Sequence, residues 1–136
     1  MNRTLNVAFS VLVLMLINGC FWFDSGEIWR GGPYLLSWLD TYENISLSYD
    51  LGEGTSVGRI EEQVFAVGWD GHYLVAQQHP NGNKNIIDYY IIDAKKDSPM
   101  AEPKDVVIGP LTEAEYKVKA VELKLPKFTK ELASLK

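Results

Sequence analysis

Two short apolar runs flank the dipeptide Asp70-Gly71 near the middle of the chain, at residues 64–69 and 72–77. This arrangement predicts a hairpin with a two-residue type I′ turn, because both turn positions need a positive φ and Asp-Gly tolerates it. The two runs then form neighbouring antiparallel strands. The predicted register pairs Trp69 with His72, Val67 with Leu74, and Phe65 with Ala76.

Both faces of this hairpin are apolar in the middle, which favours a sheet that is covered on both sides. Residues 86–92 are rich in β-branched and aromatic residues and predict a third strand, so residues 64–93 form an antiparallel meander. Upstream, residues 45–49 alternate as a half-buried strand does, and residues 34–39 predict another strand. Residues 50–58 are rich in glycine and are interpreted as a connection.

The C-terminal part has a different pattern. Thr112 and Glu115 have the spacing of a capping box, which predicts a helix near residues 113–123 that Pro126 ends. The alternation of Tyr116, Val118 and Ala120 with lysines also allows a strand, but the capping signal favours the helix. The apolar stripe expected on that helix comprises Ala114, Val118, Val121 and Leu125. The sequence also allows a short final helix from Thr129.

Taken together, these patterns predict a mainly β fold with a C-terminal helix, in the α+β class. The expected architecture is an antiparallel meander sheet with one helix packed on it. We expect a single globular domain over residues 33–136, which is long enough for one hydrophobic core.

The N-terminus has the three parts of an export signal over residues 1–19. Arg3 is followed by an apolar run, residues 7–17, which is too short to span a bilayer as a helix. The segment Ile17-Asn18-Gly19-Cys20 resembles the lipobox of bacterial lipoproteins, although Asn18 departs from the usual small residue. The resemblance implies cleavage before Cys20, acyl chains such as palmitate on Cys20, and attachment to the cell membrane or outer membrane. Residues 20–32 would be the anchor and tether.

The aromatic residues 21–23 directly follow the expected anchor. Aromatic side chains favour the bilayer–water interface, so these three can lie among the lipid head groups. Alternatively, they begin the packed domain.

The charge of the chain restricts the classes of partner. After removal of residues 1–19 the chain carries 12 basic and 18 acidic residues, a formal charge of −6. An acidic domain is repelled by phosphate backbones, so we expect no nucleic-acid partner. Membrane attachment is expected through the lipid on Cys20 and not through charge.

Few residues suggest catalysis or metal binding. The two histidines, His72 and His79, are seven residues apart and on one strand would point to opposite faces. We therefore expect no metal and no other cofactor. Carboxylates for a hydrolase are available, but nothing fixes their spacing. These candidates are Glu53, Glu61, Glu62, Asp88 and Asp93.

Three segments resemble a family of small bacterial lipoproteins of unknown function. They are Gly68-Trp69-Asp70-Gly71-His72-Tyr73-Leu74-Val75-Ala76 with Gln78-His79-Pro80, then Tyr89-Tyr90-Ile91-Ile92-Asp93, then Gly109-Pro110-Leu111-Thr112. The resemblance implies export and a fold, and it implies no chemistry.

The function expected from these features is a non-catalytic binding or assembly module on the envelope. An envelope-located inhibitor of a hydrolase is the alternative, and a hydrolase that uses carboxylates is a third hypothesis. Trp69, Asp70 and His72 at the hairpin tip are the candidate contact for a partner, because tryptophan is enriched at binding hot spots. The simpler interpretation is a cross-strand pair of Trp69 and His72 that only stiffens the hairpin.

Overall fold

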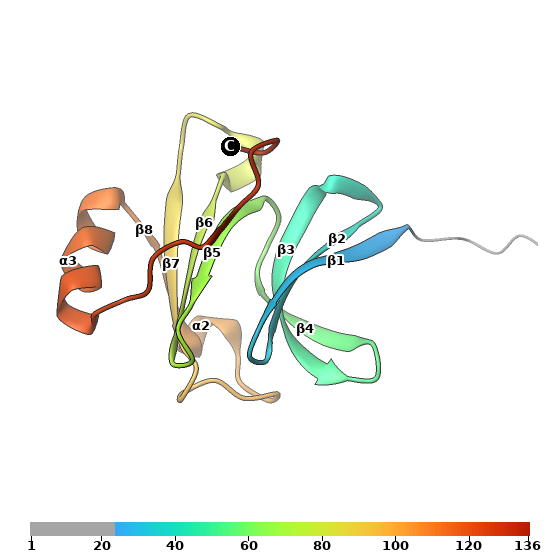
Figure 1. Cartoon of the computed structure of the whole chain (residues 1–136), viewed down its shortest axis with the longest axis horizontal. Helices are drawn as coiled ribbons and strands as arrows, with labels where there is room; N and C mark the ends of the chain where they lie inside the picture. Colours follow the sequence, from blue (N-terminus) through green and yellow to red (C-terminus); the bar gives the residue numbers. More distant parts are fainter. Residues whose placement is uncertain (1–23) are drawn as a thin grey trace, which may run out of the picture.

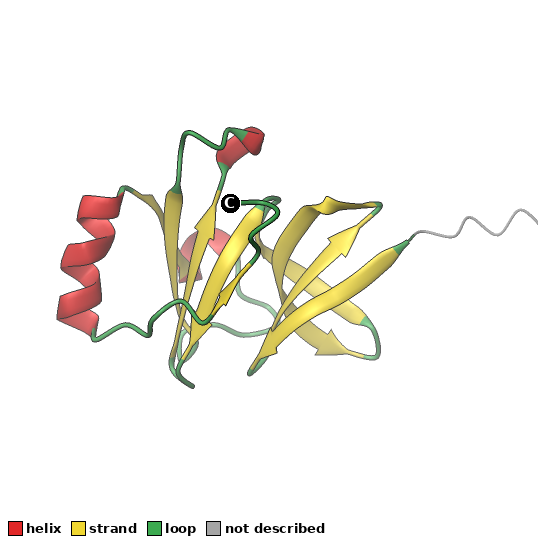
Figure 2. Ribbon diagram, turned by 45° about the horizontal axis from the view of Figure 1, so that its top comes forward, coloured by secondary structure: helices red, strands yellow, loops and turns green. Residues whose placement is uncertain are grey.

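A computed structural model describes residues 24–136. The expected signal, the lipidation at Cys20 and the aromatic residues 21–23 lie outside the described residues. The described chain forms two antiparallel sheets and one longer helix, as Figures 1 and 2 show. The prediction of a mainly β fold with a C-terminal helix is confirmed, but the strands divide between two sheets instead of forming one.

The first sheet contains the first four strands in sequence order. They are β1 (Ser25–Gly31), β2 (Tyr34–Leu39), β3 (Thr41–Gly52) and β4 (Thr55–Ile60). Strand β1 lies in the segment that the sequence analysis assigned to the tether. The predicted strands at residues 34–39 and 45–49 are confirmed within β2 and β3.

The second sheet has the strand order β8-β7-β6-β5-β9. Its strands are β5 (Val64–Trp69), β6 (Tyr73–Gln78), β7 (Asp88–Asp93), β8 (Val107–Leu111) and β9 (Lys130–Glu131). Strands β5 to β7 confirm the predicted meander, although β7 begins two residues later than expected. Short helical turns, η1 (Pro80–Gly82) and α2 (Pro103–Val106), lie in its connections.

The main hydrophobic core lies between the two sheets. Its fully buried side chains include Leu36, Ile45 and Leu47 from the first sheet and Val67 and Leu74 from the second. The other face of the second sheet carries a smaller cluster around Val75, Ile91, Tyr89 and Tyr116. Helix α3 (Glu113–Leu123) covers this face and lies at the far end of the molecule from the first sheet in Figure 1. The second sheet is therefore covered on both sides, as its two apolar faces predicted.

The register predicted for the β5–β6 hairpin is wrong by two residues. Trp69 pairs with Leu74 and Val67 with Ala76. The reason is Asp70, whose Oδ1 accepts hydrogen bonds from the backbone N–H groups of His72 (2.8 Å) and Tyr73 (2.7 Å). Asp70 and Tyr73 therefore flank the turn, and Gly71 and His72 occupy its two central positions. Only Gly71 has a positive φ (94°), as in a type II′ turn.

A two-residue turn with positive φ at both positions is found elsewhere, in the segment interpreted as a connection. Glu53 (φ 54°) and Gly54 (φ 76°) join β3 to β4, and Gly52 pairs with Thr55. This is the arrangement of a type I′ turn. The interpretation of residues 50–58 as a connection is therefore wrong, because most of them belong to the two strands.

The predicted helix and its capping box are confirmed. The N–H of Glu115 donates to the hydroxyl of Thr112, and the Glu115 carboxylate accepts from the Thr112 backbone N–H at 2.7 Å. The predicted apolar stripe is wrong, since Val118 and Val121 are 68% and 82% exposed. The face that packs is set by Tyr116, which stacks on Tyr89 with ring centroids 4.8 Å apart.

The segment after α3 forms no further helix. Instead, Lys130 and Glu131 pair with Val67 and Ala66 as strand β9. The carbonyl of Phe65 accepts a hydrogen bond from Leu132, whose side chain is buried in the main core. Across residues 24–136, no helix combines the length and apolar character needed to span a bilayer.

Candidate functional site

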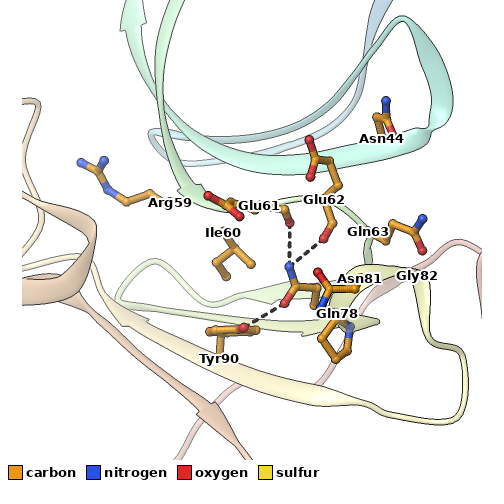
Figure 3. A pocket seen from close by; sticks show the side chains of 11 residues that line it. Asn44, Arg59, Ile60, Glu61, Glu62, Gln63, Gln78, Asn81, Gly82 and Tyr90 are labelled. Atoms are coloured by element: carbon orange, nitrogen blue, oxygen red, sulfur yellow. Dashed lines mark hydrogen bonds between the residues drawn. The ribbon is translucent and has the colours of Figure 1, made fainter.

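The chain crosses from the first sheet to the second at residues 61–63, and a hollow of about 500 Å³ lies beside this crossover. We call it the junction hollow. Its volume is within the range of small-molecule sites. It is shown in Figure 3 and is lined by Asn44, Arg59, Ile60, Glu61, Glu62, Gln63, Gln78, Pro80, Asn81, Gly82 and Tyr90.

Gln78 fixes one wall of the junction hollow. Its amide nitrogen donates to the backbone carbonyls of Glu61 (3.0 Å) and Glu62 (2.7 Å), and its amide oxygen accepts from the Tyr90 hydroxyl at 2.8 Å. These bonds are the dashed lines in Figure 3. Burial raises the pKa of the Tyr90 phenol, and the charges of Asp88 and Glu61 raise it further. The phenol therefore stays a hydrogen-bond donor, and the crossover is held against β6 and β7.

Two residues of the junction hollow have a left-handed backbone. Gln63 has φ 47° and Asn81 has φ 50°. Asparagine is common in this region, but glutamine is not, and each such residue costs roughly 1–2 kcal/mol. Strained residues of this kind concentrate at functional sites. Their amide side chains form no hydrogen bond with another residue in the described part of the chain.

The charged side chains at the rim of the junction hollow are acidic. Glu61 and Glu62 are exposed at its rim. The cation Arg59 is engaged elsewhere, because its buried guanidinium pairs with Asp97 at 2.8 Å. The hollow therefore offers amides, a phenol and two carboxylates around Ile60 and Pro80. Such groups can bind a polar, hydrogen-bonding ligand that carries no net negative charge.

The predicted contact residues at the hairpin tip lie outside the junction hollow. Trp69 is half-buried and packs edge-on against Tyr34, with ring centroids 5.5 Å apart. Its indole also lies so close to Gly32 that an added Cβ there would come within 2.6 Å. Trp69 pairs with Leu74 in the ladder, so the predicted cross-strand pair with His72 is wrong.

Asp70 and His72 lie at the turn itself. Burial opposes ionisation of Asp70, but the hydrogen bonds from Tyr73 and His72 prevail and lower the pKa of its carboxyl. His72 stacks on Tyr73 with centroids 4.0 Å apart, and its Nε2 lies 3.0 Å from Oδ1 of Asp93. A partly exposed pair of this kind has a small effect on stability.

His79 is separate from His72. Its ring is 2% exposed, stacks on Phe65 at 4.3 Å, and has Nδ1 2.8 Å from the carbonyl oxygen of Ile86. A carbonyl oxygen can only accept, so Nδ1 donates this hydrogen bond, and Nε2 is buried without a partner among the described residues. Residues 24–136 contain no group of three or more histidine, cysteine, aspartate or glutamate side chains placed to hold a metal ion.

Sequence reasoning did not identify the junction hollow as a site. Glu61 and Glu62 were noted as possible carboxylates and Gln78 as part of a motif, but these residues are far from Asn44 and Tyr90 in sequence. The polar run Glu61-Glu62-Gln63 between two apolar strands signals a connection. It does not reveal which strands from the two sheets lie beside that connection.

The comparisons with known proteins give one match. Neither the curated proteins nor the solved structures contain a match to this chain. A family model described as "Protein of unknown function (DUF3997)" matches residues 33–135, which is most of the chain. The chain therefore belongs to the DUF3997 family.

Proposed function

We propose that this protein is exported, anchored to a bacterial membrane by lipid on Cys20, and binds a ligand in the envelope without catalysis. The anchor is inferred from the export signal over residues 1–19 and from the lipobox-like segment that ends at Cys20. Two or three acyl chains would hold the protein firmly, since each buried methylene contributes about 0.8 kcal/mol.

The junction hollow is the proposed ligand site. The observation that carries this assignment is the pair of left-handed, non-glycine residues, Gln63 and Asn81, whose amides border the same hollow. Gln78 holds the hollow in shape before any ligand arrives, which reduces the entropy lost on binding. The ligand would be neutral or cationic and rich in hydrogen-bonding groups.

Mass spectrometry tests the anchor. The mature N-terminal peptide should begin at Cys20 and carry two or three acyl chains, and Cys20→Ser should release the protein or leave it unprocessed. A mature protein that begins elsewhere with a bare thiol would refute the anchor.

Native mass spectrometry of the chain isolated from its own envelope tests the site. Glu53→Gly is a matched control for Gln63→Gly, because both residues have a left-handed backbone and Glu53 lies in a turn outside the hollow. We expect a bound small molecule to be retained by Glu53→Gly and lost from Gln63→Gly. Equal retention by the two variants would refute the junction hollow as the site.

A hydrolase is the second candidate, because Glu61 and Glu62 both line the junction hollow. Glycosidases need two carboxylates on opposite sides of the bond that is cleaved, one acting as acid. Both side chains are exposed. If the protein is a hydrolase, the parent turns over an envelope glycan, and Glu61→Gln and Glu62→Gln each abolish that turnover. If it is a binding module, the parent shows no turnover.

A further inference from the structure

Charge is unevenly distributed along this chain. Residues 24–63, which include the first sheet, contain eight acidic residues and two basic residues, and the first lysine of the chain is Lys84. Both basic residues are in ion pairs. Arg30 bonds to Glu27 at 2.7 Å and also to Asp50, and Arg59 bonds to Asp97. The first sheet therefore presents an acidic surface with no unpaired cation among its described residues.

The outer face of the first sheet is hollowed. This face is opposite the core, and its groove has a volume of about 560 Å³. We call it the outer groove. It is lined in part by hydroxyl side chains from all four strands of this sheet, namely Ser25, Ser37, Ser46, Ser48, Thr55 and Ser56. The inward neighbours Leu36, Ile45 and Leu47 are fully buried, as the alternation along β2 and β3 requires.

Ser48 is the most informative residue of the outer groove. The residue as a whole is 7% exposed, and its hydroxyl is not among the buried polar atoms that lack a partner within residues 24–136, so it is reached by solvent. Opposite it in the ladder is Gly58, where an added Cβ would meet no atom within 4 Å. This hydroxyl lines the groove, so a bound polar group can take the place of the water that solvates it.

The ionised groups of the outer groove indicate the charge of that ligand. The side-chain hydrogen bond from Arg30 lowers the pKa of Glu27, and the backbone N–H of Gly52, followed by Arg30, lowers the pKa of Asp50. Both carboxylates stay ionised near neutral pH and share the single cation Arg30. Glu53 adds a further negative charge at the same groove.

We propose that the outer groove binds a basic, extended segment of a partner protein. Lysine or arginine side chains of that segment would meet Glu53 and Asp50, and its backbone and polar side chains would bond to Ser48 and its neighbouring hydroxyls. Small residues at the groove let an extended chain approach closely. This surface is separate from the junction hollow, so the inference does not depend on the ligand proposed there.

The test uses the full chain in detergent and a short fluorescent peptide of alternating lysine and serine. Fluorescence anisotropy measures binding, and a peptide with glutamate in place of lysine is the negative probe. Glu53→Lys should weaken binding by about tenfold, because it replaces an attraction by a repulsion at the groove. Glu122→Lys, on exposed α3 at the opposite end of the molecule, changes the net charge equally and should leave binding unchanged.

Two further variants examine the groove itself. Ser48→Ala removes a hydroxyl that has no partner within residues 24–136, so the fold should be unaffected while binding weakens by about fivefold. Gly58→Val, at a residue without positive φ, should fill the space beside Ser48 and abolish binding.

The proposal is overturned by any of three results. Equal weakening by Glu53→Lys and Glu122→Lys would mean that net charge alone attracts the peptide. Full binding by Ser48→Ala and Gly58→Val would place the peptide elsewhere. Self-association of the chain that the peptide reverses would make a second copy, and not another protein, the occupant.

Discussion

Arg59 and Asp97 form an ion pair whose two side chains are both completely buried. The Arg59 Nε lies 2.9 Å from Oδ2 of Asp97, and its second terminal nitrogen lies 2.8 Å from Oδ1. The same carboxylate accepts a hydrogen bond from the Tyr34 hydroxyl at 2.9 Å, and burial raises the pKa of that phenol well above its ordinary value. The pair ties the connection after β7 to β4 of the first sheet, and thereby joins the two sheets.

Removing one partner of this pair should strongly destabilise the protein. Asp97→Asn leaves the guanidinium of Arg59 buried without a counter-charge, which should lower the free energy of unfolding by about 3–5 kcal/mol. Urea unfolding followed by circular dichroism measures the change. The double variant Arg59→Met with Asp97→Leu buries no charge and should recover much of the loss. A loss in the double variant as large as that of Asp97→Asn would contradict this account.

A charge placed between the sheets should be more damaging still. Val67 is fully buried in the main core. Val67→Asp should lower the free energy of unfolding by at least about 4 kcal/mol, because the new carboxylate has no partner there. Val121→Asp is the matched control, since Val121 is 82% exposed on α3. Its effect should stay within about 0.5 kcal/mol. Similar melting temperatures for the two variants would show that the assigned register and faces are wrong.

Trp69 should behave as a packing residue. Trp69→Ala removes the indole from Tyr34 and Gly32 and should lower the free energy of unfolding by about 3 kcal/mol. His72→Ala loses the partly exposed pair with Asp93 and the stacking on Tyr73, so it should cost about 1 kcal/mol. Thermal melts of both variants provide the comparison. An unchanged melting temperature in Trp69→Ala would instead support the hairpin tip as a partner contact.

The sequence predicted those features that depend on local patterns. The meander follows from alternating and β-branched residues, and α3 follows from the capping box of Thr112 and Glu115. The errors arise where tertiary contacts decide between local alternatives. The Asp70-Gly71 signal predicted a hairpin correctly, but the two hydrogen bonds to the Asp70 side chain moved the turn by one residue. Which face of α3 packs on the sheet depends on the contact of Tyr116 with Tyr89, and no pattern within the helix reveals that contact.

Neither candidate site could be predicted from the sequence, because each depends on how strands that are distant in sequence pack together. The junction hollow needs Asn44, residues 61–63 and Tyr90 to meet, which requires knowing how two sheets pack. The outer groove needs the serines of β2, β3 and β4 to share one face. Alternation indicated that Ser46 and Ser48 point away from the core, but it gave no information about the curvature that makes the face concave.

The capping box should make α3 sensitive to acid. The hydrogen bonds from the Thr112 backbone N–H and hydroxyl lower the pKa of Glu115 below its ordinary value of 4.5. A lowered pKa contributes stability that is present above the unfolded value and is lost as the pH falls through the folded value. The stability difference between the parent and Glu115→Gln should therefore shrink as the pH falls below 4.5. Urea unfolding across this acidic range measures it, and a difference that does not change with pH would contradict this role.

Gln63→Gly should raise stability while it removes ligand binding. Glycine relieves the left-handed strain of roughly 1–2 kcal/mol, but loses somewhat more backbone entropy on folding, so the net gain should be about 0.5–1 kcal/mol. Glu53→Gly, with φ 54°, should gain a similar amount. The midpoints of urea unfolding compare the two variants. If Gln63→Gly is instead destabilised, the Gln63 side chain stabilises the crossover, and its unfavourable backbone is required for folding rather than for a ligand.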